Sequence, residues 1–165
     1  MIKKIMVWGG IIAASIALDI WTKALAVANL MDIDFQEFIP GLLRLNYVEN
    51  TGAAFGMMKD KRWLFIIVST VAIIVMLALL IIKHKEFGIL SGAALAMIIG
   101  GGIGNQIDRI AKGYVVDFFE FEFISFPVFN VADSFITVGA VLMVVFVLVE
   151  EIQSIRKKKK ENKEN

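Results

Sequence analysis

The sequence predicts an all-α membrane protein, a bundle of four transmembrane helices with a small extracytoplasmic flap or cradle that contains β-strands. The first observation is composition, because 58% of the 165 residues are apolar, whereas soluble domains usually hold about 45–50%. The second is arrangement, because the apolar residues gather in four long blocks that each approach the ~20 residues needed to cross a bilayer. The third is the alternation of apolar and polar residues between two blocks, which is typical of strands.

The four apolar blocks give the predicted spans in chain order. The spans cover residues 5–29, 63–82, 87–108 and 128–150. Buried helices of a soluble protein are rarely apolar on every face four times over, so lipid is the expected surrounding. We expect residues 1–155 to form one membrane-embedded domain, and residues 156–165 to form a solvated, disordered basic tail in the cytoplasm.

The first span also has features of a cleavable signal peptide. Lys3 and Lys4 precede its apolar run, and small residues follow at 26–28. Asp19 and Lys23 interrupt the region just before the would-be cleavage site. This interruption favours a retained transmembrane helix over a removed leader.

Lysine and arginine counts predict the orientation. If both termini lie on one side, that side holds ten of these residues and the other side holds six, with Lys23 inside a span. The basic excess marks the cytoplasmic side, so both termini are expected in the cytoplasm. The outer segments are then 31–62 and 109–127. The alternation of Leu43 to Tyr47 predicts a short strand, and Pro40-Gly41 predicts a turn before it.

Polar residues within the spans fall at one depth. With about 1.5 Å of rise per residue, Asp19 and Lys23 lie roughly 21 and 27 Å from the inner face. On the same ruler of about 1.5 Å per residue, Asn105 and Asp108 lie roughly 27 and 31 Å from it, and Asp133 lies about 6 Å below the outer boundary. Ionisable residues are costly in lipid and ask for a function. The sequence therefore predicts one polar site near the outer leaflet.

The residue types available at this depth limit the chemistry. The chain has no cysteine, and its single histidine, His84, lies between two lysines away from this level. Cysteine nucleophiles and thiolate metal sites are therefore excluded, and a Ser-His-Asp triad is disfavoured. A net charge of +1 gives no indication of nucleic-acid binding. A serine-lysine pair of Ser134 and Lys23 stays open, as does a carboxylate-bound metal, although nearby oxygen ligands are few.

A pair of aspartates is the stronger hypothesis. Asp117 lies in an apolar stretch between Val116 and Phe118, and Asp133 lies near the start of the last span. Two carboxylates a few ångströms apart cannot both ionise readily, so they share one proton. One can then act as a base toward water while the other acts as an acid.

Four motifs occur in order along the chain. They are Asp19-Ile20-Trp21-Thr22-Lys23, then Asn50-Thr51-Gly52-Ala53-Ala54-Phe55, then Gly101-Gly102-Ile103-Gly104-Asn105-Gln106-Ile107-Asp108-Arg109 with Val115-Val116-Asp117-Phe118, and finally Phe129-Asn130-Val131-Ala132-Asp133-Ser134. With these motifs the chain resembles the lipoprotein signal peptidase family, also called signal peptidase II, over nearly its whole length. The stretch between the last two motifs is short and rich in phenylalanine.

The resemblance implies an intramembrane aspartyl endopeptidase of the bacterial cytoplasmic membrane. Such an enzyme removes the signal peptide of diacylglyceryl-modified prolipoproteins, cutting on the N-terminal side of the lipidated cysteine at the outer face. The catalytic pair implied here is Asp117 and Asp133. The residues implied to support substrate binding and site geometry are Asp19, Lys23, Asn50, Gly52, Asn105, Asp108, Arg109 and Asn130.

The resemblance also implies the cofactor and the partners. The family uses no metal or other cofactor, is inhibited by globomycin, and has a surface sheet and a flexible outer loop over its active site. We expect prolipoproteins and membrane lipid as partners, no nucleic acid, and a working monomer. Arg109 is expected to order the outer loop by pairing with an acid such as Asp108.

Two readings from other classes compete with a peptidase. A small transporter would also carry intramembrane acids, but transporter sites tend to lie near the midplane between repeated halves. Here the acids lie at one edge and no repeat is visible. A non-catalytic scaffold is the other reading, and the presence of both candidate aspartates argues against an inactive homologue.

Overall fold

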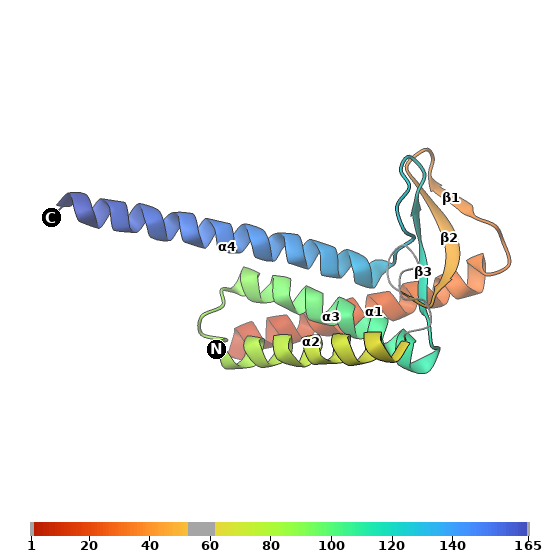
Figure 1. The fold of residues 1–165 in the computed structure, drawn as a ribbon, viewed down its shortest axis with the longest axis horizontal. Helices are drawn as coiled ribbons and strands as arrows, with labels where there is room; N and C mark the ends of the chain where they lie inside the picture. The colour runs from red at the N-terminus through yellow and green to blue at the C-terminus, as the bar shows by residue number, and fades with distance from the viewer. Residues whose placement is uncertain (1, 53–61, 165) are drawn as a thin grey trace.

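The structure is a computed structural model that describes residues 2–52 and 62–164, with side chains described through Arg156. Its four long helices are α1 (Ile2–Leu30), α2 (Arg62–Ile82), α3 (Ile89–Ala111) and α4 (Val131–Glu164). They run side by side, and a small sheet lies across one end of the bundle, while both termini lie toward the other end (Figure 1). Each helix is long and apolar enough to cross a membrane. This architecture confirms the predicted fold class.

The central helix of the bundle is α3. Its most apolar window is 56% buried, against 11% for the windows of α2 and α4, whose exposed side chains suit contact with lipid. Small residues let the neighbouring backbones approach α3 closely. A Cβ on Gly100 would lie 2.7 Å from Ser15 of α1, and a Cβ on Gly139 of α4 would lie 2.6 Å from the carbonyl oxygen of Ala94.

Polar side chains attach α2 to α3. The Gln106 amide donates to the Thr70 hydroxyl at 2.6 Å and to the Ile66 carbonyl at 3.0 Å, and it accepts from the Ser69 hydroxyl at 2.5 Å. In lipid these groups have no water to bind, so satisfying them across the helix pair stabilises the pair. The second span is therefore joined to the bundle by its two polar residues.

An apolar core toward the end of the bundle away from the sheet joins α1, α2 and α3. Trp8 is almost fully buried beside Ile99, and its indole nitrogen donates to the carbonyl of Ile89 at 3.1 Å. Gly92 leaves space for this ring, because a Cβ there would collide with it. A buried indole needs such a hydrogen-bond partner, and here the bond also fixes the start of α3 against α1.

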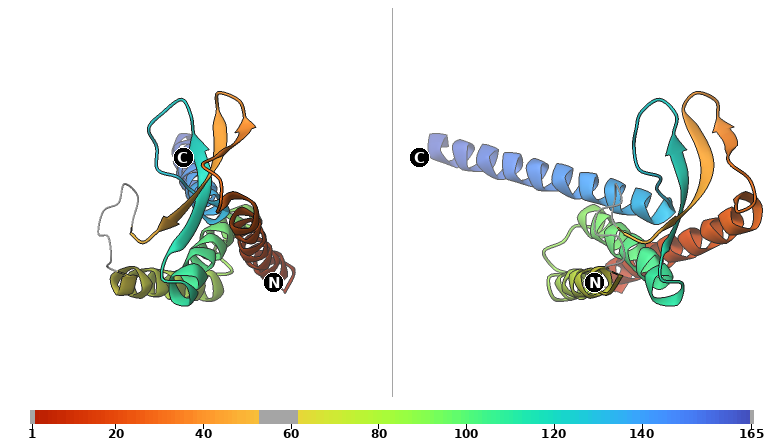
Figure 2. Two further views of the ribbon diagram at one scale, coloured as in Figure 1. Left: turned by 90° about the vertical axis from the view of Figure 1, so that its right-hand side faces the viewer. Right: turned by 45° about the vertical axis from the view of Figure 1, so that its right-hand side comes forward.

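The sheet contains β1 (Gln36–Ile39), β2 (Leu43–Asn50) and β3 (Val115–Phe121), antiparallel in the order β1-β2-β3. The predicted turn before β2 is present, and Gly41 adopts a φ of 72° there, a conformation that favours glycine. The sheet stands across the bundle end from which α4 begins (Figure 2). Its buried side chains, which include Val116 and Phe118, pack on Ala26 and Leu30 of α1.

The C-terminal tail differs from the sequence expectation. The tail was expected to be disordered from residue 156, but α4 continues as a helix through Glu164. Lysine, arginine and glutamate are good helix formers, and extending an existing helix adds one hydrogen bond per residue fixed. The flexible loop expected over the site, and the Ala53-Ala54-Phe55 part of the second motif, lie outside the described residues.

Candidate active site

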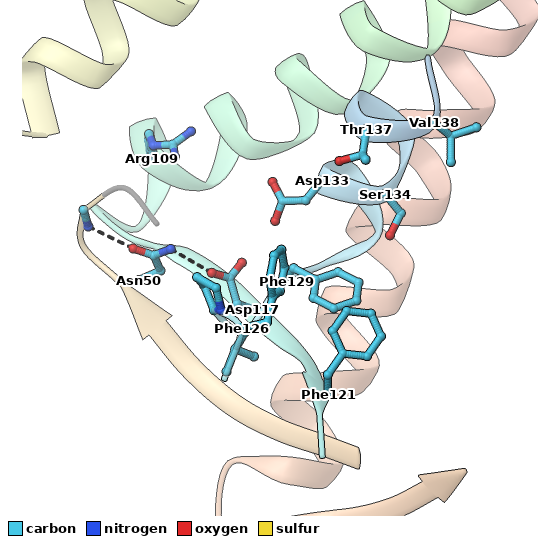
Figure 3. A pocket seen from close by; sticks show the side chains of 13 residues that line it. Asn50, Arg109, Asp117, Phe121, Phe126, Phe129, Asp133, Ser134, Thr137 and Val138 are labelled. Atoms are coloured by element: carbon cyan, nitrogen blue, oxygen red, sulfur yellow. Dashed lines mark hydrogen bonds between the residues drawn. The ribbon is translucent and has the colours of Figure 1, made fainter. Parts of the chain in front are cut away.

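A cavity of about 460 Å³ lies where α3, α4 and the sheet meet. Figure 3 shows the carboxyl groups of Asp117 and Asp133 entering it from β3 and α4. Its lining residues are Asn50, Gly52, Arg109, Asp117, Phe121, Phe126, Pro127, Val128, Phe129, Asp133, Ser134, Thr137 and Val138. Side chains from four separate segments of the chain therefore surround one space.

Asp117 is held on β3 by two amides. Asn50 donates to its Oδ2 at 2.8 Å and Asn130 donates to its Oδ1 at 2.7 Å, while the residue is only 2% exposed. Burial raises the pKa of Asp117 to about 7, although the Asn50 and Asn130 hydrogen bonds act in the opposite direction. The nearby charge of Asp133 adds to the rise. This carboxyl therefore keeps its proton to a higher pH than an exposed aspartate does.

Asp133 belongs to a reciprocal cap at the start of α4. Its backbone N–H donates to Asn130 Oδ1 at 2.9 Å, and the backbone N–H of Asn130 donates to Asp133 Oδ2 at 3.2 Å. This is the geometry of a capping box, with asparagine at the N-cap and aspartate three residues later. The other oxygen of Asp133 accepts from Asn105 at 2.8 Å. The capping contact thus fixes the direction of the Asp133 carboxylate.

Asn130 and Asn105 connect the two aspartates to α1. The Asn130 amide bridges from Asp117 Oδ1 to Asn105 Oδ1, the latter at 3.0 Å. Asn105 Oδ1 also accepts from Lys23 Nζ at 2.8 Å. Asn130 is fully buried, so each of these hydrogen bonds replaces one that water would otherwise supply. The chain of contacts therefore links both carboxyl groups through two amides to one buried ammonium.

A buried ionic cluster lies beneath this network. Lys23 Nζ lies 2.7 Å from Asp19 Oδ2 and 3.3 Å from Asp108 Oδ2, and Lys112 lies 2.9 Å from Asp108 Oδ1. Asp19 also accepts the backbone N–H of Ala132 at 3.0 Å, which ties α1 to the first turn of α4. Lys23 is buried with both carboxylates, whereas Lys112 is exposed and pairs with Asp108 from the edge of the cluster.

Asp108 also fixes the approach to β3. Its Oδ2 accepts the backbone N–H of Val116 at 3.1 Å. The expected pairing of Arg109 with Asp108 is wrong for the described residues, because Asp108 is paired with Lys23 and Lys112 instead. The Arg109 guanidinium stacks over the Phe65 ring at 5.6 Å and lines the cavity. Lys23 and Lys112 already compensate the charge of the Asp108 carboxylate.

Of the ten residues singled out from the sequence, five line the cavity and the other five are linked to them by hydrogen bonds and ion pairs. Gly52 donates its N–H to Asn50 Oδ1 at 3.0 Å, which orients the amide that reaches Asp117. The serine-lysine alternative finds no support, because the Ser134 hydroxyl donates to the Asn130 carbonyl at 3.1 Å, while Lys23 contacts acids and Asn105. Within residues 2–52 and 62–156, no three acidic or histidine side chains are grouped to hold a metal ion.

Sequence reasoning missed the aromatic wall of the cavity. Phe121, Phe126 and Phe129 line it opposite Arg109 (Figure 3). Their rings pack on one another with centroids 5.2–6.1 Å apart, the range of favourable aromatic pairs. The sequence shows that this stretch is rich in phenylalanine. Whether the rings face the aspartates depends on how the loop after β3 folds back.

Comparison with known proteins places the chain among named relatives. A family model described as signal peptidase (SPase) II matches residues 11–149. A lipoprotein signal peptidase of Enterococcus faecalis is 37% identical over 151 residues, covering 92% of this chain and 93% of that protein. A lipoprotein signal peptidase of Streptococcus pyogenes serotype M5 is 40% identical over 136 residues, covering 82% of this chain and 89% of that protein.

Two solved structures share the fold. Both are described as bacterial membrane enzymes, at 2.3 Å and 1.9 Å resolution. The first has a TM-score of 0.77 and 29% identity, covering 92% of this chain and 90% of that chain. The second has a TM-score of 0.73 and 30% identity, covering 90% of this chain and 94% of that chain.

Proposed function

The chain belongs to the signal peptidase II family of aspartic-type lipoprotein signal peptidases, and from that premise we propose that Asp117 and Asp133 are its catalytic pair. One observation carries the proposal. Two carboxyl groups from separate elements enter one cavity, joined through Asn130, and one of them has a pKa of about 7. A pair with one protonated and one ionised carboxyl group supplies the two forms that acid-base hydrolysis needs.

In the proposed reaction Asp133 is the base and Asp117 the acid. Asp133 takes a proton from water while the water oxygen bonds to the carbonyl carbon of the scissile peptide. Asp117 gives its proton to the amide nitrogen, and the carbon–nitrogen bond breaks. The products are a new carboxyl terminus on the signal peptide and a new amino terminus on the lipoprotein. The pair ends with one proton on Asp133, so a transfer between the two groups restores the starting state.

Arg109 supplies positive charge in this reaction. Its side chain lines the same cavity as both aspartates (Figure 3). Negative charge grows on the carbonyl oxygen as water attacks, and a fixed cation nearby stabilises that charge. We therefore assign Arg109 to charge stabilisation, with Asn50 and Asn130 orienting the carboxyl group of Asp117.

The cavity suits a peptide bond next to a lipid-bearing residue. Its polar end carries the aspartates and Arg109, and its other end is walled by phenylalanine side chains and Val138. We propose that the bond on the N-terminal side of the diacylglyceryl cysteine is placed at the polar end. The lysine and arginine distribution supports a cytoplasmic position for both termini, and the sheet end with its cavity then faces the outer leaflet of the bacterial cytoplasmic membrane.

The partners follow from the same proposal. The substrates are lipid-modified prolipoproteins that diffuse in the membrane, and globomycin inhibits the enzyme by occupying the cavity. A single chain contributes all the proposed catalytic residues, which supports a working monomer. The cavity residues come from the sheet, the end of α3 and the start of α4, which lie together at one end of the bundle (Figure 1). A site at one end, rather than between repeated halves, favours a peptidase over a transporter.

The test is identification of the cut bond. The purified protein in detergent is mixed with a diacylglyceryl-modified prolipoprotein and with the same precursor lacking lipid, and mass spectrometry identifies the products. We expect one cut before the lipidated cysteine, none in the unmodified precursor, and inhibition by globomycin. Equal cleavage of both precursors, or a cut elsewhere, would contradict the proposed specificity.

A further inference from the structure

The end of α3 carries an unusual contact with the start of α2. Arg62 is the first residue of α2, and its Nε donates to the carbonyl oxygen of Arg109 at 2.8 Å. Its Nη2 donates to the carbonyl oxygen of Ile110, also at 2.8 Å. From the sequence alone, Arg62 is only one of the basic residues on the outer side. The structure gives it two specific acceptors in another span.

These two acceptors are carbonyl groups that α3 itself cannot satisfy. The last four carbonyl groups of a helix lack partners within it, and α3 ends at Ala111. The Asp108 carbonyl accepts the backbone N–H of Lys112 at 2.8 Å, and the next two carbonyl groups accept from Arg62. A cation at a helix C-terminus is also favoured by the helix dipole. Arg62 therefore caps α3 from a different helix.

The turn after α3 is shaped around the same guanidinium. Gly113 has a φ of 92°, and a Cβ there would lie 3.4 Å from Nη1 of Arg62. Two residues later β3 begins, and it carries Asp117. The capped segment thus includes the backbone of Arg109 and leads directly into the strand of Asp117, and both side chains line the cavity.

We propose that Arg62 is a positioning residue of the peptidase, whose guanidinium holds the end of α3 so that the Arg109 side chain faces the two aspartates. The inference rests on the proposed function. Arg62 itself is absent from the cavity lining and acts through Arg109. Only arginine offers two donors in a fixed planar fork, so lysine cannot bind both carbonyl groups in the same way.

The experiment measures kcat and KM on a diacylglyceryl-modified prolipoprotein for the wild type, Arg62→Gln, Arg62→Lys and Arg109→Gln. A displacement of about 1 Å near the reacting groups lowers rates about 100-fold, so Arg62→Gln should lower kcat by about 10- to 100-fold with little change in KM. The kcat of Arg62→Lys should lie between the values of the wild type and of Arg62→Gln. The control Lys83→Gln removes an exposed cation at the opposite end of the bundle and should leave kcat unchanged.

A double-mutant cycle separates positioning from simple stabilisation. If Arg62 acts through Arg109, adding Arg62→Gln to Arg109→Gln should change kcat by less than about twofold. Independent effects that multiply would overturn the inference, as would wild-type kcat in Arg62→Gln. If Arg62→Gln does not fold, wild-type kcat in Arg62→Lys overturns it instead. Failure of the wild type to cleave would refute the proposed function itself, which is a distinguishable result.

Discussion

Replacing Asn50 with alanine should raise the pKa of Asp117 and extend activity to higher pH. The Asn50 amide donates to Asp117 Oδ2 at 2.8 Å and favours the ionised carboxylate. Hydrogen bonds to charged groups contribute about 1.5–3 kcal/mol, and one pKa unit corresponds to about 1.4 kcal/mol. Loss of this bond therefore raises the pKa of Asp117 by about one unit or more from its value of about 7.

The assay is the pH dependence of kcat/KM, which reports groups of the free enzyme. The pair needs one proton, so wild-type activity should fall as pH rises through about 7. In Asn50→Ala that descending limb should move upward by about one pH unit, although the maximal rate falls. Asn46→Ala is the control, because Asn46 donates to Glu120 and makes no hydrogen bond with the aspartates. An unmoved limb, or a limb moved to lower pH, would refute the assignment of Asp117 as the acid.

Three further predictions concern packing, substrate and stability. Phe126→Ala removes apolar contact with the lipidated substrate and should raise KM about tenfold. The value of kcat, measured in the same assay, should change less. Gly104→Ala should lower the melting temperature, because its Cβ would lie 2.5 Å from Asp19 Oδ2 and such overpacking costs about 1–3 kcal/mol. Gly10→Ala, with nothing within 4 Å, should not lower it. Thermal stability should fall as pH rises from about 4 to about 7, since the folded state binds the Asp117 proton more tightly than the unfolded state, and Asp117→Asn should reduce this dependence. A wild-type pH dependence retained in Asp117→Asn would contradict the last prediction.

Much of the fold and of the site could be predicted from the sequence because an α-helix has a fixed rise per residue. A long apolar run in lipid satisfies its backbone only as a helix or within a closed barrel. A fixed rise per residue then places Asp19, Asn105 and Asp133 at one level. The structure joins these three elements through Lys23 and Asn130. The depth of a residue along a membrane-spanning helix can therefore be predicted from the sequence, even for residues as far apart in the chain as Asp19 and Asp133.

Contacts that depend on strand register and side-chain direction could not be predicted from the sequence. Asp117 reaches the cavity because β3 pairs with β2 in a register that places it opposite Val48. The pairing of Asp108 with Lys112 has a sequence signal in its i,i+4 spacing, and that signal would have corrected the expected pairing with Arg109. The aromatic wall needed the path of the loop after β3, which local patterns do not determine.

The proposed function requires Asp117 and Asp133 to act as one acid-base pair. Its most direct test is single-turnover cleavage of a diacylglyceryl-modified prolipoprotein by Asp117→Asn, Asp133→Asn and the double variant, with globomycin binding and melting temperature measured on each. We expect each single variant to lose cleavage as completely as the double variant, while all three remain folded and bind the inhibitor. Substantial cleavage by either folded single variant would contradict the claim and remove that aspartate from the pair.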